Sequence, residues 1–466
     1  MEWVSDRYNL DSLPSGVFVI PVGEFYILYA PLHHLSALIN YSALTAIRSH
    51  FSGGLTAIDE IKLLVTALSE NVITPRPLTG GLGEPYFLGL LPTRGCNMAC
   101  RYCDFLTGDS RVMDFNTTRH AVNAYIVHLK GRQCAVGALH FFGGEPFYAP
   151  QVVQFALEYA RLKAFEATLS LHFESTTNGF YDEDLATWIG DNLNTVVLSL
   201  DGFADVQNHH RPGRNGLPSF ERVTTSASIF AASPCELVLR TAVSQLNVES
   251  LPEIAAWFAE SFSPAQVCFE PLSESAASRR HGLTPPEPLM YARKFNEAAE
   301  ILRAYGIRTV LSSADLSENR VTACPLGRDA LIVTPEGRIN ACYLLDEEWR
   351  RQGLNLELGR VTPSGFNLDS DALQHMRDFS VDNKSRCARC FCRFSCAGGC
   401  HVHHPGNLPA GQYDDLCLRT RLVTAAQLLD DLGRDDLRRA WLADEKAAWQ
   451  TARCCDDRLF PLEQLR

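Results

Sequence analysis

Strand-like and helical stretches alternate between residues 86 and 310, and this alternation constrains the fold more than any other feature of the chain. Six apolar runs read as strands, at residues 86–91, 138–142, 169–176, 195–200, 237–242 and 266–270. Helical patterns lie between them, including residues 118–129, 152–162, 183–192 and 251–262. Six β/α repeats predict an α/β fold whose parallel strands curl into a partial (β/α)6 TIM-like barrel. Functional sites in such barrels lie at the C-terminal ends of the strands.

Three cysteines follow the first predicted strand with the spacing C-x3-C-x2-C: Cys96, Cys100 and Cys103. The usual [4Fe–4S] motifs supply four cysteine ligands. Three thiolates therefore leave one iron open to an external ligand, which is what a catalytic site requires. A structural zinc site would need a fourth ligand nearby, and three unrelated buried thiols are the remaining alternative.

This spacing, with the aromatic Tyr102 before the last cysteine, resembles the radical S-adenosylmethionine (SAM) superfamily. In that family the open iron binds the amino and carboxylate groups of SAM. An electron from the cluster then cleaves SAM to methionine and a 5′-deoxyadenosyl radical. The resemblance implies that Cys96, Cys100 and Cys103 are both cluster ligands and catalytic residues. It also implies that Tyr102 packs beside the adenine, although an aromatic residue there would equally suit a core.

A Gly-Gly-Glu-Pro turn follows the second predicted strand. It resembles the GGEP motif that holds the amino group of SAM, and its four residues are Gly143, Gly144, Glu145 and Pro146. The glycines permit close backbone approach. By the resemblance, Glu145 accepts a hydrogen bond from the ammonium group of SAM.

Two further polar segments end the third and fourth predicted strands. They resemble the TNG and SxDG…RPG segments of radical SAM enzymes with a C-terminal SPASM domain; the matching residues are Thr176, Asn178, Ser199, Asp201 and Arg211. The resemblance implies that Ser199 and nearby polar groups bind the carboxylate or ribose of SAM. Arg211 is a candidate carboxylate clamp. Asn178 and Asp201 suit turn positions equally well.

The C-terminal third contains a second cysteine pattern, C-x12-G-x4-C, a gap, C-x2-C-x5-C-x3-C, a gap and a last C. It resembles the seven-cysteine signature of SPASM domains, which carry two auxiliary [4Fe–4S] clusters. A pair of zinc sites is the alternative. The resemblance implies an outer cluster on Cys387, Cys390, Cys396 and Cys417. It implies an inner cluster on Cys324, Cys342 and Cys400.

The inner cluster would have three cysteines, because Ala330 stands where some relatives have an eighth. Cys392, Asp329 and the segment His401-Val-His-His404 are candidates for its remaining ligand, although loop histidines are usually solvated. Five cysteines belong to no motif and are expected to be buried or incidental thiols: Cys134, Cys235, Cys268, Cys454 and Cys455.

Composition narrows the classes of partner. The net charge of −12, from 42 basic and 54 acidic residues, argues against nucleic acid. The acidic start of the chain lacks a signal-peptide pattern, and no apolar run is long enough for a membrane span. A cytoplasmic location follows as an expectation. Sixteen cysteines in a reducing compartment indicate metal or redox chemistry.

Four units are expected along the chain. Residues 1–80 are expected to form a small α+β unit, with strands at 17–21 and 24–29 and helices at 35–47 and 57–68. The unit resembles peptide-recognition domains; an N-terminal extension that packs on the barrel is the alternative. A linker at 75–83 leads to the radical SAM core at 84–312. The SPASM domain covers 320–425 and a helical segment covers 426–466.

The resemblance implies an oxidoreductase that modifies a ribosomally made precursor peptide by forming a crosslink, with flavodoxin or ferredoxin as the reducing partner. Alternatives are a peptide-splicing or epimerising enzyme, an anaerobic sulfatase maturase, a small-molecule oxidoreductase and a non-catalytic electron carrier. Sulfatase maturases place an Asp directly after the cysteine of the G-x4-C segment. Tyr343 stands there, which favours a different peptide maturase.

Overall fold

The computed structural model describes residues 13–54, 59–70, 72–73, 75, 87–103, 105, 109–324, 330–344, 346–376, 378–404 and 412–454. Apart from residue 75, the expected linker at 75–83 lies outside the described residues, as do Asp329 and Cys455. Among the described helices, none is both long and apolar enough to cross a lipid bilayer.

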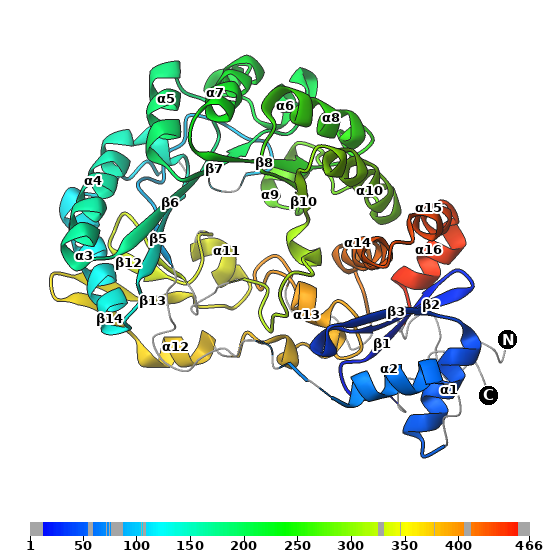
Figure 1. Cartoon of the computed structure of the whole chain (residues 1–466). Coiled ribbons are helices and arrows are strands. Elements are labelled where there is room, and N and C mark those ends of the chain that lie inside the picture. Colours follow the sequence, from blue (N-terminus) through cyan, green and yellow to red (C-terminus); the bar gives the residue numbers. More distant parts are fainter. Residues whose placement is uncertain are drawn as a thin grey trace.

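The six predicted strands are confirmed, and they form one parallel sheet in chain order. They are β4 (Phe87–Leu90), β5 (Val136–Phe141), β6 (Ser170–Thr177), β7 (Thr195–Ser199), β8 (Glu236–Val243) and β9 (Gln266–Pro271). A short strand, β10 (Arg308–Val310), extends this sheet beyond β9. Figure 1 shows the sheet curving into an open barrel, with helices on its outer side.

The outer helices include the four that the sequence predicts. They are α3 (Phe115–Gly131), α4 (Pro150–Ala167), α5 (Glu183–Asn192), α7 (Phe220–Ala232), α8 (Leu251–Phe262) and α10 (Pro288–Ala304). Aspartates begin two of them, since Asp114 accepts from Thr117 N and Asp182 accepts from Leu185 N.

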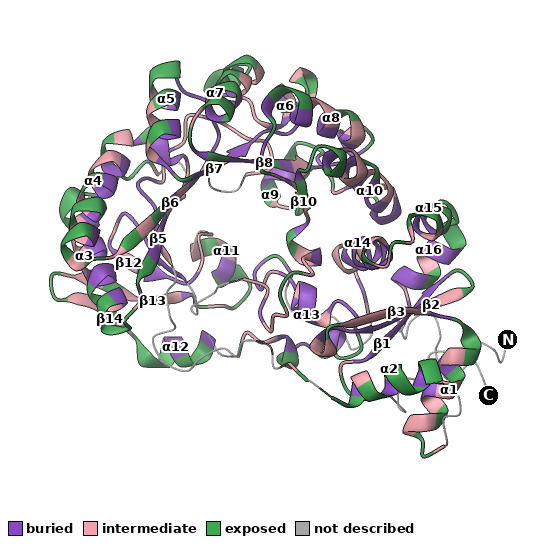
Figure 2. Ribbon diagram, viewed as in Figure 1, coloured by how far each residue is buried: buried purple, intermediate pink, exposed green. Residues whose placement is uncertain are grey.

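Side chains of the barrel strands point alternately outward and inward. The outward side chains are buried against the helices, and the inward ones are more accessible. On β5, Leu139 and Phe141 are fully buried, whereas His140 between them is half-buried. The same period of two appears on β6, where Glu174 and Thr176 are half-buried. Figure 2 shows buried segments where the strands meet the helices. Polar side chains therefore face the interior of the barrel.

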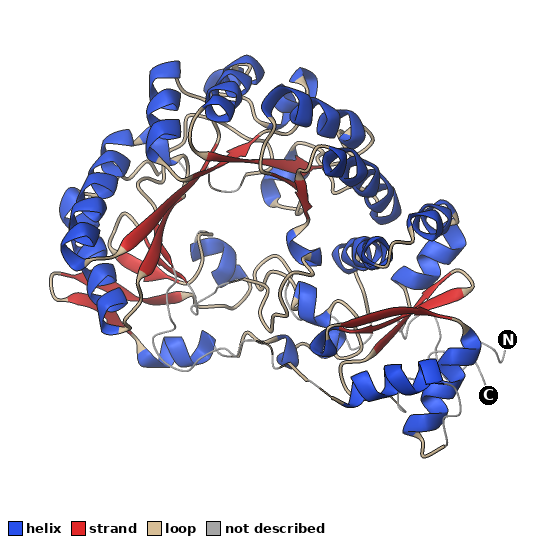
Figure 3. Ribbon diagram, viewed as in Figure 1, coloured by secondary structure: helices blue, strands red, loops and turns tan. Residues whose placement is uncertain are grey.

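The cysteine-rich region continues the barrel sheet past its first strand. Strand β11 (Ala330–Val333) pairs in parallel with β4, and β12 (Arg338–Asn340), β13 (Glu357–Thr362) and β14 (Gly365–Leu368) follow in antiparallel order. Helix α11 (Asp346–Arg351) lies between β12 and β13 in the chain. Figure 3 shows these strands as an extension of the central sheet. The region is thus joined to the barrel by backbone hydrogen bonds.

The N-terminal residues form a three-stranded antiparallel sheet of β1 (Phe18–Val22), β2 (Phe25–Ala30) and β3 (Leu35–Ile39), followed by α1 (Tyr41–Phe51) and α2 (Asp59–Ser69). The predicted hairpin is confirmed. The predicted helix at 35–47 is wrong for its first five residues, because β3 pairs with β2 and Asn40 then caps α1 by accepting from Ala43 N.

This N-terminal sheet is covered on both faces. One face packs against α1 and α2 in a small separate cluster that includes Val19 and Leu28. The opposite face, with Phe18, Ile20 and Ile27, belongs to the main hydrophobic core. Helix α16 (Glu445–Ala452) completes this packing by contacting β1. Helix α14 (Asp415–Asp431) contacts both α16 and α10, and so connects this region to the barrel.

Candidate active site

The cysteine loop lies at the C-terminal end of β4, where a barrel site is expected. Backbone hydrogen bonds join it to the segment after the short helix α6 (Ala204–His210): Ala99 N donates to Pro212 O at 2.8 Å, and Arg101 N donates to His210 O at 2.9 Å. The loop is therefore held against the turn that carries Arg211.

The three cysteines of this loop are partly buried. Burial, with Glu145 and Cys100 nearby, raises the pKa of Cys96 to about 12. Burial also raises the pKa of Cys100 to about 12, and Cys103 acts in the same direction. Such thiols become thiolates when a bound cation stabilises the negative charge. Three neighbouring thiols beside an open cavity fit a cluster that keeps one iron for a ligand.

The Gly-Gly-Glu-Pro turn follows β5 and lies directly against the cysteine loop. Gly143 has a φ of +147°, and a Cβ atom there would lie 2.6 Å from Thr93 O. A Cβ atom on Gly144 would lie 2.2 Å from Gly95 O. Neither contact is possible for a larger residue, so the two glycines allow the close approach. Pro146 is buried and begins the short 3-10 helix η3 (Pro146–Tyr148).

The Glu145 carboxylate is directed into the protein. It is 1% exposed and accepts hydrogen bonds from Thr177 Oγ1 at 2.8 Å, Asn178 N at 2.8 Å and Phe147 N at 3.2 Å. Burial raises the pKa of Glu145 to about 7. In this geometry the carboxylate joins the turn after β5 to the end of β6.

Asn178 connects the end of β6 to the cysteine loop. Its Nδ2 donates to Asn97 Oδ1 at 2.8 Å and lies 3.7 Å from Cys96 Sγ. Its Oδ1 also accepts from Phe180 N, as a turn residue would. Thr176 faces the barrel interior instead, with its Oγ1 3.2 Å from His140 Nε2. Asn178 therefore stabilises the local turn and also lies against Cys96 of the cysteine loop.

Asp201 is the centre of a buried polar network two residues beyond Ser199, the buried last residue of β7. Its carboxylate accepts from Tyr102 Oη at 2.7 Å and from Arg211 Nε at 2.9 Å, and lies 3.2 Å from His210 Nδ1. Although burial opposes ionisation, Arg211 and His210 lower the pKa of Asp201. The Arg211 guanidinium also lies 5.2 Å from the centre of the Tyr102 ring. The network fixes Tyr102 beside the cysteines.

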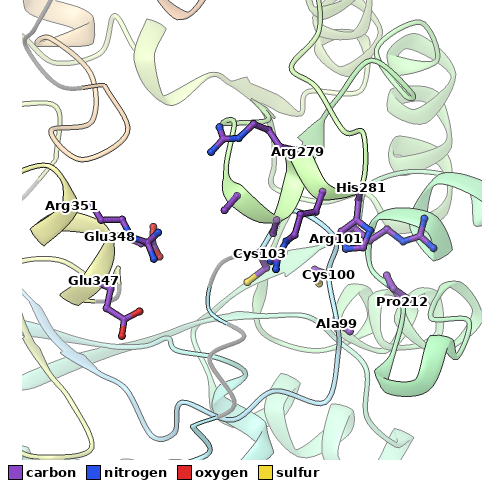
Figure 4. A pocket seen from close by; sticks show the side chains of 13 residues that line it. Ala99, Cys100, Arg101, Cys103, Pro212, Arg279, His281, Glu347, Glu348 and Arg351 are labelled. Carbon is purple, nitrogen blue, oxygen red and sulfur yellow. The ribbon is translucent and has the colours of Figure 1, made fainter.

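Two cavities border the cysteine loop. The larger has a volume of about 700 Å³ and is bordered by Cys100, Cys103 and residues of α11 (Figure 4). The second, of about 340 Å³, is bordered by Tyr102, Arg211 and residues at the ends of β8 and β9. Cys103 and Glu348 line both cavities. Their combined size suits two ligands side by side.

The four cysteines expected for an outer cluster surround one small pocket: Cys387, Cys390, Cys396 and Cys417. Cys392 lines the same pocket and is buried. The pocket also contains the Arg421 guanidinium, whose Nη1 lies 3.1 Å from Cys390 Sγ and whose Nη2 donates to Cys454 O at 2.6 Å. Four thiols around a single pocket fit a closed cluster site.

The three cysteines expected for an inner cluster also lie near one another. The pKa of Cys342 is raised by burial, and the proximity of Cys324 and Cys400 raises it further. Ala330, at the position of the eighth cysteine of some relatives, begins β11 and is buried.

The loop histidines are better packed than their sequence suggests. His401 and His404 are each 6% exposed, so the expectation of solvated side chains is wrong for both. His404 Nδ1 lies 3.0 Å from Asp414 Oδ2, and its Nε2 lies 3.5 Å from Cys417 Sγ. His403 is 40% exposed and pairs with Glu348 at 3.3 Å.

Tyr343 and His140 form a contact that the sequence did not reveal. The Tyr343 hydroxyl lies 2.7 Å from His140 Nδ1, and its ring packs 4.6 Å from the Phe142 ring centre. A Cβ atom on Gly89 would lie 2.5 Å from that hydroxyl. Tyr343 therefore fills space within the barrel. His140 is a polar residue at an inward-facing position of β5. This position was the one sign in the sequence that His140 faces the barrel interior.

The central domain is similar to a known family. Residues 90–258, which include the cysteine loop, match the model of the radical SAM superfamily. The chain contains a radical SAM domain. The matched range covers β4 to α8, and thus the turns that carry Glu145, Asn178 and Asp201.

Curated proteins that are similar to the chain include sulfatase-maturating enzymes. The chain is 22% identical to the "Cysteine-type anaerobic sulfatase-maturating enzyme" of Clostridium novyi, over 69% of this chain and 89% of that protein. It is 24% identical to the "Serine-type anaerobic sulfatase-maturating enzyme" of Klebsiella aerogenes, over 66% of this chain and 77% of that protein.

Solved structures share the fold of the chain. The structure of anSMEcpe with bound AdoMet and Cp18Cys peptide superposes with a TM-score of 0.58, at 18% identity, over 77% of this chain and 99% of that one. SuiB of Streptococcus suis bound to S-adenosylmethionine gives a TM-score of 0.52, at 14% identity, over 84% and 95% of the two chains.

Proposed function

We propose that this protein is a radical SAM enzyme that removes hydrogen from a cysteine or serine side chain within a peptide or protein. The observation that carries this proposal is the 700 Å³ cavity between the cysteine loop and α11. Cys100 and Cys103 border it on one side, and the cysteine-rich region borders it on the other. The sulfatase-maturating relatives, and the peptide bound to one structural relative, support the class of substrate.

The proposed cofactors are SAM and three [4Fe–4S] clusters. Cys96, Cys100 and Cys103 would hold the first, and the two cysteine sets of the C-terminal region would hold the others. When bound, the first cluster and SAM supply a 5′-deoxyadenosyl radical that abstracts a hydrogen atom from carbon. The residues of the chain position the peptide and exclude water from this site.

Crosslink formation on a precursor peptide is the second candidate. Tyr343 favours it, because the resemblance to sulfatase maturases implies an Asp at that position. The Tyr343 hydroxyl is instead held at His140.

Anaerobic assays of the reconstituted protein with SAM and dithionite test the proposal. The substrates are synthetic peptides with a single cysteine or serine, and short peptides encoded by neighbouring genes. We expect 5′-deoxyadenosine and a peptide two hydrogens lighter in mass spectrometry. Oxidation of a CH2–OH or CH2–SH group gives a C=O or C=S group that reacts with a hydrazide, whereas a crosslink does not.

The control is the triple variant Cys96→Ala, Cys100→Ala, Cys103→Ala. Fully loaded wild-type protein should contain about twelve irons, and the variant about four fewer. If the variant still produces 5′-deoxyadenosine, the cluster assignment is wrong. If the wild type cleaves SAM and converts a small metabolite but changes no peptide, the substrate class is wrong.

A further inference from the structure

Arginines gather around the two cavities, although the chain as a whole carries a net charge of −12. The larger cavity is bordered by two glutamates and by four arginines, which are Arg101, Arg279, Arg280 and Arg351. The smaller cavity adds two further glutamates and the arginines Arg211 and Arg240. The walls of the site are therefore more positively charged than the molecule as a whole.

Two of these arginines end a short helix that is fixed to the cysteine loop. Helix α9 (Ala276–Arg280) begins with a reciprocal capping box at Ser275. The Ser275 hydroxyl also donates to Tyr102 O at 3.2 Å. Arg279 and Arg280, in the last turn of α9, are therefore held at a fixed place beside the loop.

Arg351 borders the larger cavity from the opposite side. It is the last residue of α11 and, like Arg280, it is exposed. Figure 4 shows Arg279 and Arg351 on opposite sides of the cavity. A peptide that enters this cavity therefore meets arginines from both the barrel and the cysteine-rich region.

Arg240 places a further positive charge on the inner face of the barrel. It lies on β8 between Leu239 and Thr241, which are both fully buried, whereas Arg240 is exposed and lines the smaller cavity. Burial lowers the pKa of His140 to about 4, and the charge of Arg240 acts in the same direction. The positive charge of Arg240 is therefore felt across the barrel interior.

Three of the glutamates that border the cavities are already engaged by other groups. Glu270 accepts from a backbone N–H at 3.0 Å. Glu274 pairs with Arg279 at 3.6 Å, and Glu348 lies 3.3 Å from His403. These carboxylates are therefore not available to the remaining arginines.

Three arginines lack such a partner in the part of the chain that the structure describes. Arg240, Arg280 and Arg351 form no hydrogen bond or ion pair with any described residue. A guanidinium group presents five N–H donors in a planar fork that matches the two oxygens of a carboxylate. Three such groups around a ligand cavity therefore fit a ligand that carries carboxylates.

We propose that these arginines bind an acidic segment of the substrate peptide, with Arg240 taking the carboxylate of an Asp or Glu beside the target residue. This inference rests on the proposed function, because it names the kind of peptide that the site accepts. Cys103 also borders the smaller cavity, so a side chain bound at Arg240 lies close to the cysteine loop. Arg280 and Arg351 attract acidic residues farther along the same peptide.

Anaerobic binding measurements on the reconstituted protein with SAM test this inference. Fluorescence anisotropy compares three short synthetic peptides that share one central cysteine and differ only in the residues around it, which are Asp, Asn or Lys. The variants are Arg240→Gln, Arg280→Gln and Arg351→Gln. Arg360→Gln is the control, because Arg360 is exposed and lines neither cavity. Iron content and SAM affinity are measured for each protein.

We expect wild type to bind the Asp peptide most tightly and the Lys peptide most weakly. Arg240→Gln should lower the affinity for the Asp peptide roughly ten- to a hundred-fold, the usual effect of losing a charge-assisted hydrogen bond, and change that for the Asn peptide by less than about two-fold. Arg280→Gln and Arg351→Gln should each lower the affinity for the Asp peptide about two- to five-fold, because exposed ion pairs contribute less. Arg360→Gln should behave like wild type.

Equal affinities of wild type for the Asp and Asn peptides overturn the inference. So does a loss of SAM affinity in Arg240→Gln, because Arg240 would then hold the carboxylate of SAM. If Arg240→Gln binds fewer irons than wild type, the two exposed arginines decide the outcome. An undiminished preference for the Asp peptide in both Arg280→Gln and Arg351→Gln then overturns the inference.

The binding assay requires no turnover, so its outcome is separate from that of the proposed function. A wild type that prefers the Asp peptide but oxidises none of the three peptides supports the acidic binding surface and contradicts the proposed function. A wild type that oxidises all three peptides and binds them equally contradicts only the inference about acidic peptides.

Discussion

The hydrogen bonds of Glu145 suggest a mutational test at the scale of a single residue. Its carboxylate accepts from Thr177 Oγ1, Asn178 N and Phe147 N, and each of these donors is buried. A buried donor without an acceptor costs about 1–3 kcal/mol. We therefore expect Glu145→Ala to lower the melting temperature and the affinity for SAM together. Glu145→Gln keeps one oxygen and should lower both by less.

Thermal unfolding and calorimetric SAM titration of the reconstituted variants measure the two effects. A direct contact between Glu145 and the SAM ammonium, as the GGEP resemblance implies, predicts a different result. In that case SAM affinity would fall roughly ten- to a hundred-fold while the melting temperature stayed constant.

At the scale of elements, the loop after β4 and the turn after β5 form one packed unit. A Cβ atom on Gly144 would lie 2.2 Å from Gly95 O, next to Cys96. Gly144→Ala must therefore separate the turn from the cysteine loop. We expect the variant to bind about four fewer irons than wild type after reconstitution, because the first cluster site loses its geometry.

Gly131→Ala is the matched control. Gly131 is the last residue of α3, and a Cβ atom added there would meet no atom of the described residues within 4 Å beyond its own helix and chain neighbours. Alanine at a compatible helical position stabilises a protein by about 0.5–1 kcal/mol. Full iron content in Gly144→Ala would contradict the packing argument.

At the scale of the whole molecule, the N-terminal sheet supports the main core. The face of β1 and β2 that contains Phe18, Ile20, Val22, Ile27 and Tyr29 packs into that core. Five such side chains contribute on the order of 10 kcal/mol when buried. We expect a chain without residues 1–80 to expose this contact surface, to aggregate and to melt at a lower temperature than the full chain.

Size-exclusion chromatography and thermal unfolding compare this chain with one that lacks residues 1–10 only, which keeps the sheet whole. A monomeric 81–466 chain with the melting temperature of the full protein would show that the N-terminal unit is independent. It would then agree with the resemblance of residues 1–80 to a separate peptide-recognition domain.

The sequence alone determined the elements of the barrel and the grouping of its cysteines. Strands β4 to β9 and helices α5 and α8 follow from local periodicity, because one face of each must be buried. The cysteines within 96–103, and those within 387–400, are also close together in the chain, so their spacing can be read directly from the sequence. The periodicity of the strands and helices and the spacing of the cysteines can therefore both be recognised without knowledge of the fold. The start of α1 was mistaken because the pairing of β3 with β2 overrides the helical preference of residues 35–39.

Only the tertiary structure decided which distant residues meet. The pairing of β11 with β4 brings the cysteine-rich region to the barrel, and α11 then faces the cysteine loop. The contacts of Glu348 with His403 and of Tyr343 with His140 depend on this arrangement. The burial of Glu145 likewise depends on β5 lying beside β6. Such contacts arise from the packing of segments far apart in the chain, which no local spacing of residues encodes.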